Sequence, residues 1–235
     1  MRRLAVCACG LLLTGCASTP EERLPSAVES EVLIARAAPP AEVADHLARA
    51  AACVDRGDEP AAVPHLVAHL QDRPDAVMIR AYLAELLLRT GQPADARREF
   101  ERFARQASGM SGEAGRHLVH AHTRLMEIAG EANDPFAVHL HRGIALVLMV
   151  RRWEGEPAAD GGELAEATLA KAARELRQAE RRKPTDPRAN VYLAEVYGRL
   201  GQPTSARTAA RRVTLPDASL TEAERGAVRN WAEMK

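Results

Sequence analysis

Histidine is the residue whose chemistry could matter most in this sequence, because imidazole binds metal ions and exchanges protons near neutral pH. Most of the histidines fall in three groups: His65 and His69; His117, His120 and His122; and His139 and His141. A metal site needs three or four convergent ligands, whereas the sequence has no His-Glu-x-x-His pattern and only scattered carboxylates. We therefore expect structural histidines, with His69 in a core position, and no metal site or cofactor.

Other residue patterns of catalysis are also missing from the sequence. It has no Gly-x-Ser-x-Gly, no glycine-rich phosphate loop after a strand, and no argued pairing of a cysteine with a histidine. Cys53 falls at a position that is normally in the core, so we expect a small buried hydrophobe and not a nucleophile. These absences predict a protein that is not an enzyme.

The elements that position these residues are helices in a repeated arrangement. Residues 75–105 predict two short amphipathic helices joined by a Gly-Gln-Pro turn. Their landmarks recur 34 residues apart, as the pairs Gly57 and Gly91, Ala62 and Ala96, and Leu66 and Phe100 show. Self-similarity at this period is typical of a helical repeat array, in which each unit buries its apolar face against its neighbours.

The landmarks resemble those of the tetratricopeptide repeat (TPR). The unit 43–76 has Ala50, Gly57, Ala62, Leu66 and Pro74; the unit 77–110 has Ala84, Gly91, Ala96 and Phe100, with Ser108 in place of the proline; the unit 187–220 has Ala194, Gly201 and Ala206. The resemblance implies an all-α fold, a right-handed superhelical stack of TPR-like helical hairpins closed by a C-terminal capping helix.

The repeat pattern is weakest in the middle, at 111–186. Three long helices are predicted there, at 113–130, 134–153 and 163–183, with a loop between the second and third. Their pairing is left open. The run Gly143–Val150 is apolar on all sides, which predicts a helix buried against several neighbours.

The last part of the chain carries further helix signals. Asp186 and Pro187 are expected to start the last repeat. The pattern from Ser219 to Glu222 indicates a capping box, and the helix that follows, within 219–234, carries an apolar side that suits a cap. That side consists of Leu220, Ala223, Ala227 and Trp231.

The amino-terminal segment indicates export. Residues 1–15 have a basic start and a short apolar run, as a signal peptide has. The run from Leu13 to Cys16, Leu-Thr-Gly-Cys, resembles the lipobox of bacterial lipoproteins, which implies lipidation of Cys16 and a membrane anchor. Residues 16–26 then form a lipidated tether before a helical domain at 27–235, whose first helix is expected at 27–37. By analogy with such lipoproteins, Ala17 implies the outer membrane, with the domain facing the periplasm.

The charge of the chain argues against a nucleic-acid partner. It has 32 basic and 32 acidic residues, and removing 1–15 takes away two arginines and leaves −2. No basic excess is present to bind a phosphate backbone.

What remains is an interaction surface. In tetratricopeptide arrays the first helices line a groove, and the resemblance places Leu47, Ala51, Met78, Ala81, Glu85, Leu88, Arg188, Val191 and Glu195 there. The lysine and asparagine clamp that some family members use for a terminal carboxylate is missing. The amino-terminal part of the groove is apolar, which suits an amphipathic helix of a partner, although helix 27–37 of the chain itself could fill it.

A small lipid-anchored stack is similar to the pilotins of type IV pilus machines, which escort an outer-membrane secretin. This resemblance implies protein partners in the cell envelope, such as a secretin or motility complex. The alternative is a structural adaptor of a gliding-motility, polysaccharide-export or cell-wall machine that binds polymer or partner proteins.

Overall fold

The computed structural model describes residues 42–110, 112–154 and 162–233, and all regular structure in these ranges is helical. The helices are α2 (Glu42–Asp55), α3 (Glu59–Asp72), α4 (Val77–Arg89), α5 (Pro93–Ala107), α6 (Gly112–Glu131), α7 (Pro135–Glu154), α8 (Gly162–Arg182), α9 (Arg188–Arg199), α10 (Pro203–Arg211) and α11 (Glu222–Glu233). The predictions of a signal peptide, a lipidated Cys16, a tether and a helix at 27–37 lie outside the described residues.

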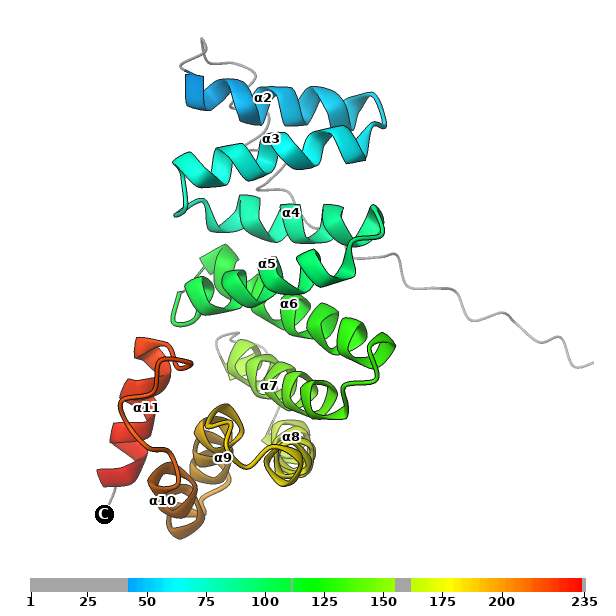
Figure 1. The fold of residues 1–235 in the computed structure, drawn as a ribbon. Coiled ribbons are helices and arrows are strands. Elements are labelled where there is room, and N and C mark those ends of the chain that lie inside the picture. Colours follow the sequence, from blue (N-terminus) through cyan, green and yellow to red (C-terminus); the bar gives the residue numbers. More distant parts are fainter. Residues whose placement is uncertain (1–41, 111, 155–161, 234–235) are drawn as a thin grey trace, which may run out of the picture.

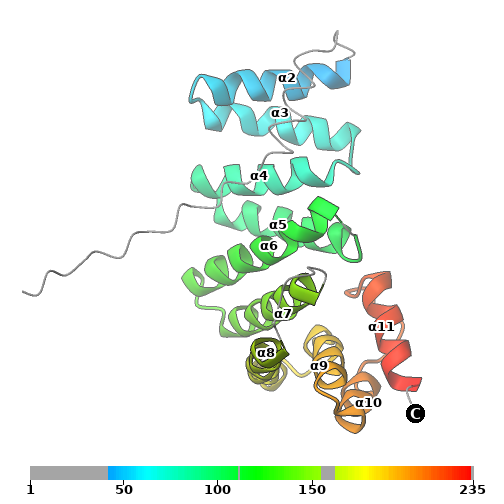
Figure 2. The same ribbon diagram turned by 180° about the vertical axis from the view of Figure 1, so that it is seen from behind.

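The helices from α2 to α10 form one column in chain order, each packing against the next (Figure 1). The axes of α2 to α5 lie roughly parallel, and those of α8 to α10 are turned by a large angle from them, which the opposite view also shows (Figure 2). Neighbouring helices are therefore in contact along the whole column, while its two ends are far apart. The expected all-α stack of helical hairpins is confirmed.

Each of the three repeat units holds one hairpin, and the same turn joins its helices. Gly57, Gly91 and Gly201 have φ angles of +75°, +75° and +69°, a left-handed backbone that glycine adopts at little cost. The residue after each glycine donates its N–H to a carbonyl five residues earlier, for example from Gln92 to Leu87 at 2.8 Å. In the second and third units a proline then begins the next helix.

The repeat-packing residues lie in the core. The alanines and large apolar residues named for the three units, from Ala50 to Ala206, are at most 1% exposed. Cys53 and His69 are also buried, as expected. Small side chains at these positions let the helices of a hairpin approach closely, and Leu66 and Phe100 fill the space beside them.

The middle of the chain contains the three long helices that the sequence predicted. Asp134 caps α7 by accepting the N–H of Ala137 at 3.0 Å. Helix α7 packs between α6 and α8 and also touches α9, which settles the pairing that the sequence left open. The apolar run Gly143–Val150 lies in this helix, and six of its eight residues are buried. No helix of the described ranges is long and apolar enough to cross a membrane.

The carboxy-terminal helix differs from the prediction in its cap and in its buried side. The capping box is formed by Thr221 and Glu224, not by Ser219 and Glu222: the Thr221 N–H donates to Glu224 at 2.7 Å, and the Glu224 N–H donates to Thr221 at 3.2 Å. Ser219 instead bonds to Asp217 in the preceding turn. Because the helix begins at Glu222, the residues on its inner side differ from those predicted.

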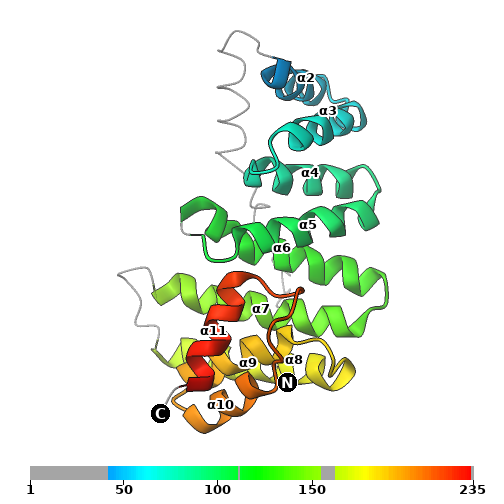
Figure 3. The same cartoon turned by 60° about the vertical axis from the view of Figure 1, so that its left-hand side comes forward.

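As a result, Val228 is buried in α11 and Ala223 is exposed, so the prediction of Ala223 on the apolar side is wrong. Leu220 is buried and Trp231 is half-buried, in agreement with their predicted place on that side. Helix α11 packs against both α9 and α10, beside the column and not beyond its end (Figure 3).

The contact between α7 and α8 gives a direct test of this packing. A Cβ atom added at Gly143 would lie 2.6 Å from Cγ and 3.3 Å from the backbone nitrogen of Leu176. We expect Gly143→Ala to lower the free energy of unfolding by about 1–3 kcal/mol, because a buried methyl group has no room there. The matched control is Gly130→Ala, where an added Cβ meets nothing within 4 Å. Urea denaturation measures both, and equal stabilities would contradict the close approach of α7 and α8.

Candidate functional site

The predicted groove residues of the first helices are mostly buried. Leu47, Ala51, Ala81 and Val191 are each at most 7% exposed, and Glu85 and Glu195 are 8% and 7% exposed. Met78, Leu88 and Arg188 are half-buried. The buried members are therefore occupied by contacts within the chain, and partner binding at the half-buried ones stays a prediction.

The two glutamates at the ninth position of their repeats hold helices together. Glu85 of α4 accepts hydrogen bonds from His120 at 2.7 Å and Arg124 at 3.0 Å, both on α6. Glu195 of α9 accepts from Arg151 of α7 at 2.7 Å and from Arg199 at 3.0 Å. Carboxylates with such partners link one helix to another, so Glu85 and Glu195 stabilise the packing of helices in this chain.

The electrostatics of Glu85 follow from its surroundings. Burial raises the pKa of this carboxyl, but the hydrogen bond from His120 and the charge of Arg124 outweigh burial, so the pKa lies below its ordinary value. Glu85 is therefore ionised at neutral pH and contributes stability to the folded state in that form.

The three histidine groups of the sequence do not gather into one site, and their members make different contacts. His139 bonds to Glu175 at 2.7 Å, and His122 of α6 lies against His141 of α7 with their Nδ1 atoms 3.0 Å apart. Burial lowers the pKa of His122 to about 3 and that of His141 well below its ordinary value, so both are neutral and one donates to the other. Within the described ranges no group of three or more His, Cys, Asp or Glu side chains could hold a metal ion.

Helix α11 covers part of the predicted groove in the last unit. A Cβ atom added at Gly198 of α9 would lie 2.1 Å from ring carbons of Trp231. The start of α11 reaches back to the end of α5, where Thr221 and Ser108 have their hydroxyl oxygens 3.3 Å apart. Between α5, α6, α7, α9 and α11 a cavity of about 60 Å³ remains, large enough for water and small for an organic ligand.

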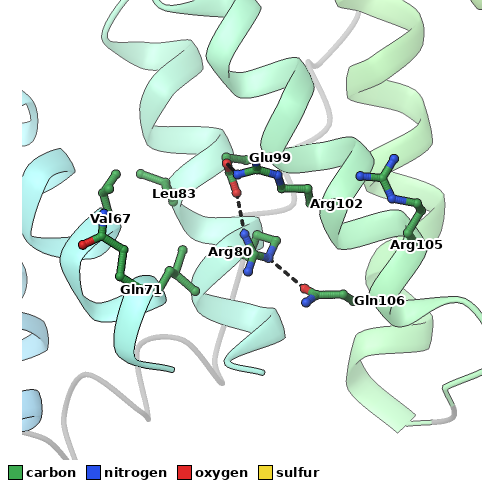
Figure 4. Close-up of a pocket in the computed structure, with 9 residues that line it drawn as sticks. Val67, Gln71, Arg80, Leu83, Glu99, Arg102, Arg105 and Gln106 are labelled. Atoms are coloured by element: carbon green, nitrogen blue, oxygen red, sulfur yellow. Dashed lines mark hydrogen bonds and ion pairs between the residues drawn. The ribbon is translucent and has the colours of Figure 1, made fainter. Parts of the chain in front are cut away.

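A larger pocket lies between α3 and α5, and residues of α4 also line it (Figure 4). Its volume is about 450 Å³; Val67, Leu70 and Leu83 supply apolar surface. Arg80 lies on its inner wall at 7% exposure and donates to Glu99 at 2.7 Å, to Gln106 at 2.7 Å and to a backbone carbonyl at 3.1 Å. This guanidinium is therefore well partnered despite its burial.

A second pocket occupies the equivalent place in the last unit. It lies between α8 and α10, is also lined by residues of α9, and has a volume of about 300 Å³. Asn190 and Leu193 line it where Arg80 and Leu83 line the first, 110 residues earlier, and Arg212 corresponds to Arg102. The two pockets therefore occur at the same place in two repeat units.

Both pockets depend on the residue at the fourth position of the repeat unit. That position holds His46, Arg80 and Asn190, whereas the tetratricopeptide pattern has tryptophan there. The smaller or more polar side chains leave the space between second helices unfilled in the two later units. His46 Nδ1 and Asn190 Oδ1 are the buried side-chain atoms without a hydrogen-bond partner among the described residues. Such atoms cost about 1–3 kcal/mol each.

These pockets lie away from the positions that the repeat pattern assigns to the groove, so they were not predicted from the sequence. A signal was present in the spacing, since Arg80 and Asn190 are both polar and buried and stand 110 residues apart at the same position of the repeat. Chemically, the pockets offer hydrogen-bonding groups beside apolar surface and no arrangement of nucleophile and base, which is typical of a binding site.

Fold and site together define an all-helical protein of stacked hairpins with pockets between its second helices. No protein-family model matches the chain, and no curated protein matches it. Among solved structures, the crystal structure of MamA protein is 16% identical, covering 82% of this chain and 96% of that chain with a TM-score of 0.39. The structure of a thermophilic TPR protein from Thermus thermophilus is 19% identical, covering 80% of each chain with a TM-score of 0.34.

The bond network at Glu85 predicts a pH-dependent loss of stability. We expect Glu85→Gln to lower the free energy of unfolding by about 1–3 kcal/mol at neutral pH, since the partners of the carboxylate lose a charged acceptor. The pKa of Glu85 is lower in the folded state, so its contribution is present above pH 4.5, the ordinary value, and is lost as pH falls through the folded pKa. The difference between wild type and variant should shrink in that range.

Denaturation of both proteins between pH 7 and pH 3 measures this difference directly. Glu127→Gln is the control, because Glu127 also pairs with Arg124 but is 46% exposed, and we expect a loss below about 1 kcal/mol. A difference at Glu85 that stays constant down to pH 3 would contradict the proposed role of its ionised form.

Proposed function

We propose that this protein is a non-enzymatic scaffold that binds other proteins and supports assembly of a machine in the cell envelope. The observation that carries the proposal is the pair of equivalent pockets between the second helices of the stack, at Arg80 and at Asn190. Both are open to solvent, mix polar with apolar surface and lie on a continuous column of helices, which suits a partner that contacts several units.

The proposal extends to where the protein acts. Leu13 to Cys16 supports lipidation of Cys16, and Ala17 supports sorting to the outer membrane with the helical domain facing the periplasm. The tether of about ten residues, fully extended, spans at most about 35 Å, so the domain works close to its membrane. Among machines assembled there, we favour a type IV pilus secretin as the partner, because pilotins combine a lipid anchor with a helical stack.

The anchor has a simple test. We expect Cys16→Ala to remove labelled palmitate from the protein and to move it from the membrane fraction to the soluble fraction, since two or more acyl chains are needed for stable anchoring. Cys53→Ala is the matched control, because Cys53 is buried in the helical domain, and it should leave both properties unchanged. Palmitate on the Cys16 variant would contradict the assignment.

The partner has a separate test. We expect deletion of the gene to reduce the secretin multimers in the outer membrane, measured by immunoblotting of envelope fractions, and expression of the wild-type chain to restore them. Normal amounts of correctly placed multimers of every secretin in the deletion strain would exclude the secretin as the partner. Co-sedimentation of the protein with purified sacculi or polysaccharide, together with normal multimers, would favour a polymer-binding adaptor instead.

A further inference from the structure

We propose that the buried imidazoles of His122 and His141 form an acid-sensitive contact, which holds α6 against α7 at neutral pH and lets this part of the column open at about pH 5. This device acts on the stability of the helical column, so it goes beyond the proposed function and neither depends on the other. It follows from the geometry of the two rings and from the charged groups around them.

The two rings meet at the contact between α6 and α7. His122 is 7% exposed and His141 is 3% exposed. Their Nδ1 atoms are 3.0 Å apart, which leaves room for one hydrogen between them, so one neutral ring donates and the other accepts. If both rings were protonated, two N–H groups would point at each other in a buried place without an acceptor. The contact therefore excludes a doubly charged pair.

The pair borders the cavity of about 60 Å³ that lies between five helices. The other charged or titratable groups that line this cavity are Glu101 and Arg105 of α5, Arg188 and Tyr192 of α9, and Glu224 of α11. They leave the rings without an anionic partner, because within the described ranges neither imidazole has a carboxylate as a hydrogen-bond partner.

The nearby carboxylates are engaged elsewhere. Glu101 pairs with Arg97 at 3.0 Å, and Glu224 accepts the N–H of Thr221 at 2.7 Å. The carboxylates that face α6 from α4 and α7 from α8 bond to other histidines: Glu85 to His120 and Glu175 to His139. A proton taken up by the pair would therefore place a positive charge in a buried site without a counter-ion of its own.

The electrostatics of the pair agree with this geometry. Burial lowers the pKa of His122 to about 3, and the charge of Arg188 adds to the effect. Burial also lowers the pKa of His141 well below its ordinary value, with smaller contributions from His122, Arg188 and Arg97. In the unfolded chain each imidazole has the ordinary pKa of 6.5, so the unfolded state binds more protons as the pH falls through this value. The folded state is therefore favoured above pH 6.5 and loses stability below it.

The size of the effect follows from this linkage. A histidine that stays neutral in the folded state and titrates with a pKa of 6.5 when unfolded increases the unfolding equilibrium constant about 30-fold between pH 7.5 and pH 5.0. Two such histidines give about 900-fold. In a stack each helix is held mainly by its neighbours, so the loss acts first where the pair lies, between α6 and α7.

Urea denaturation of the purified full chain at pH 7.5 and pH 5.0 tests the pair. We expect the increase in the unfolding equilibrium constant to be about 900-fold larger for the wild type than for the double variant His122→Asn, His141→Asn, whose amides keep a polar group at both places without titrating. Ile144→Val is the matched control, because Ile144 lines the same cavity and is 2% exposed. It should lower stability at both pH values and keep the pH dependence of the wild type. Equal pH dependence in the wild type and the double variant would overturn the inference.

Two measurements on the wild type decide the question even if the double variant does not fold. By NMR of the folded protein, the ring signals of His122 and His141 should stay constant from pH 7.5 to pH 5.0, and a titration of either ring near pH 6.5 would reject the buried neutral pair. By amide hydrogen exchange corrected for the intrinsic effect of pH, acidification should accelerate exchange in α6 and α7 at least about ten-fold more than in α2 and α3. Equal acceleration in all four helices would reject a local opening at the pair.

Discussion

The close approach of neighbouring helices is the constraint on which this structure depends. Alanines at Ala50, Ala62, Ala84 and Ala96 are at most 1% exposed, and at Gly143 even a methyl group would clash with Leu176. Backbones that meet at such short range leave the larger side chains to fill the space between hairpins. Where a unit does not provide a large apolar side chain at that place, the column remains intact and a pocket results. Tight packing and open pockets are therefore two outcomes of one geometry.

Buried polar groups give this column its specific connections. Glu85 ties α4 to α6, and Glu195 ties α9 to α7, so each carboxylate joins helices of different hairpins. Arg80 instead ties the two helices of one hairpin, α4 and α5, through Glu99. Removing one partner of such a buried pair is costly, which ties the register of one hairpin to that of the next. Asn190 contrasts with them, since it is buried without a bonded partner for its Oδ1 atom among the described residues.

The fold could be predicted from the sequence because its strongest signals are local. The turn glycines at 57, 91 and 201 and the alanine spacing specify hairpins, and Asp134 specifies the start of α7. The pairing of α6 to α8 and the position of α11 depend on contacts between distant parts of the chain, which no short pattern records. The capping box was placed two residues early because Ser219 and Thr221 both offer a hydroxyl three residues before a glutamate. The surface was harder to predict than the core, since burial of Glu85 and Glu195 follows from partners on other helices.

The contact of the last helix with α5 has a mechanical consequence. Thr221 lies beside Ser108, and Trp231 is seated against Gly198, so α11 spans from the end of α5 to α9 and closes that part of the column into a ring. A load applied at the amino-terminal end would be resisted by this ring, whereas α2 and α3 are joined to the rest of the described column chiefly through α4. The elastic part of the molecule is thus its first hairpin, and the region around Asn190 would keep its shape under tension.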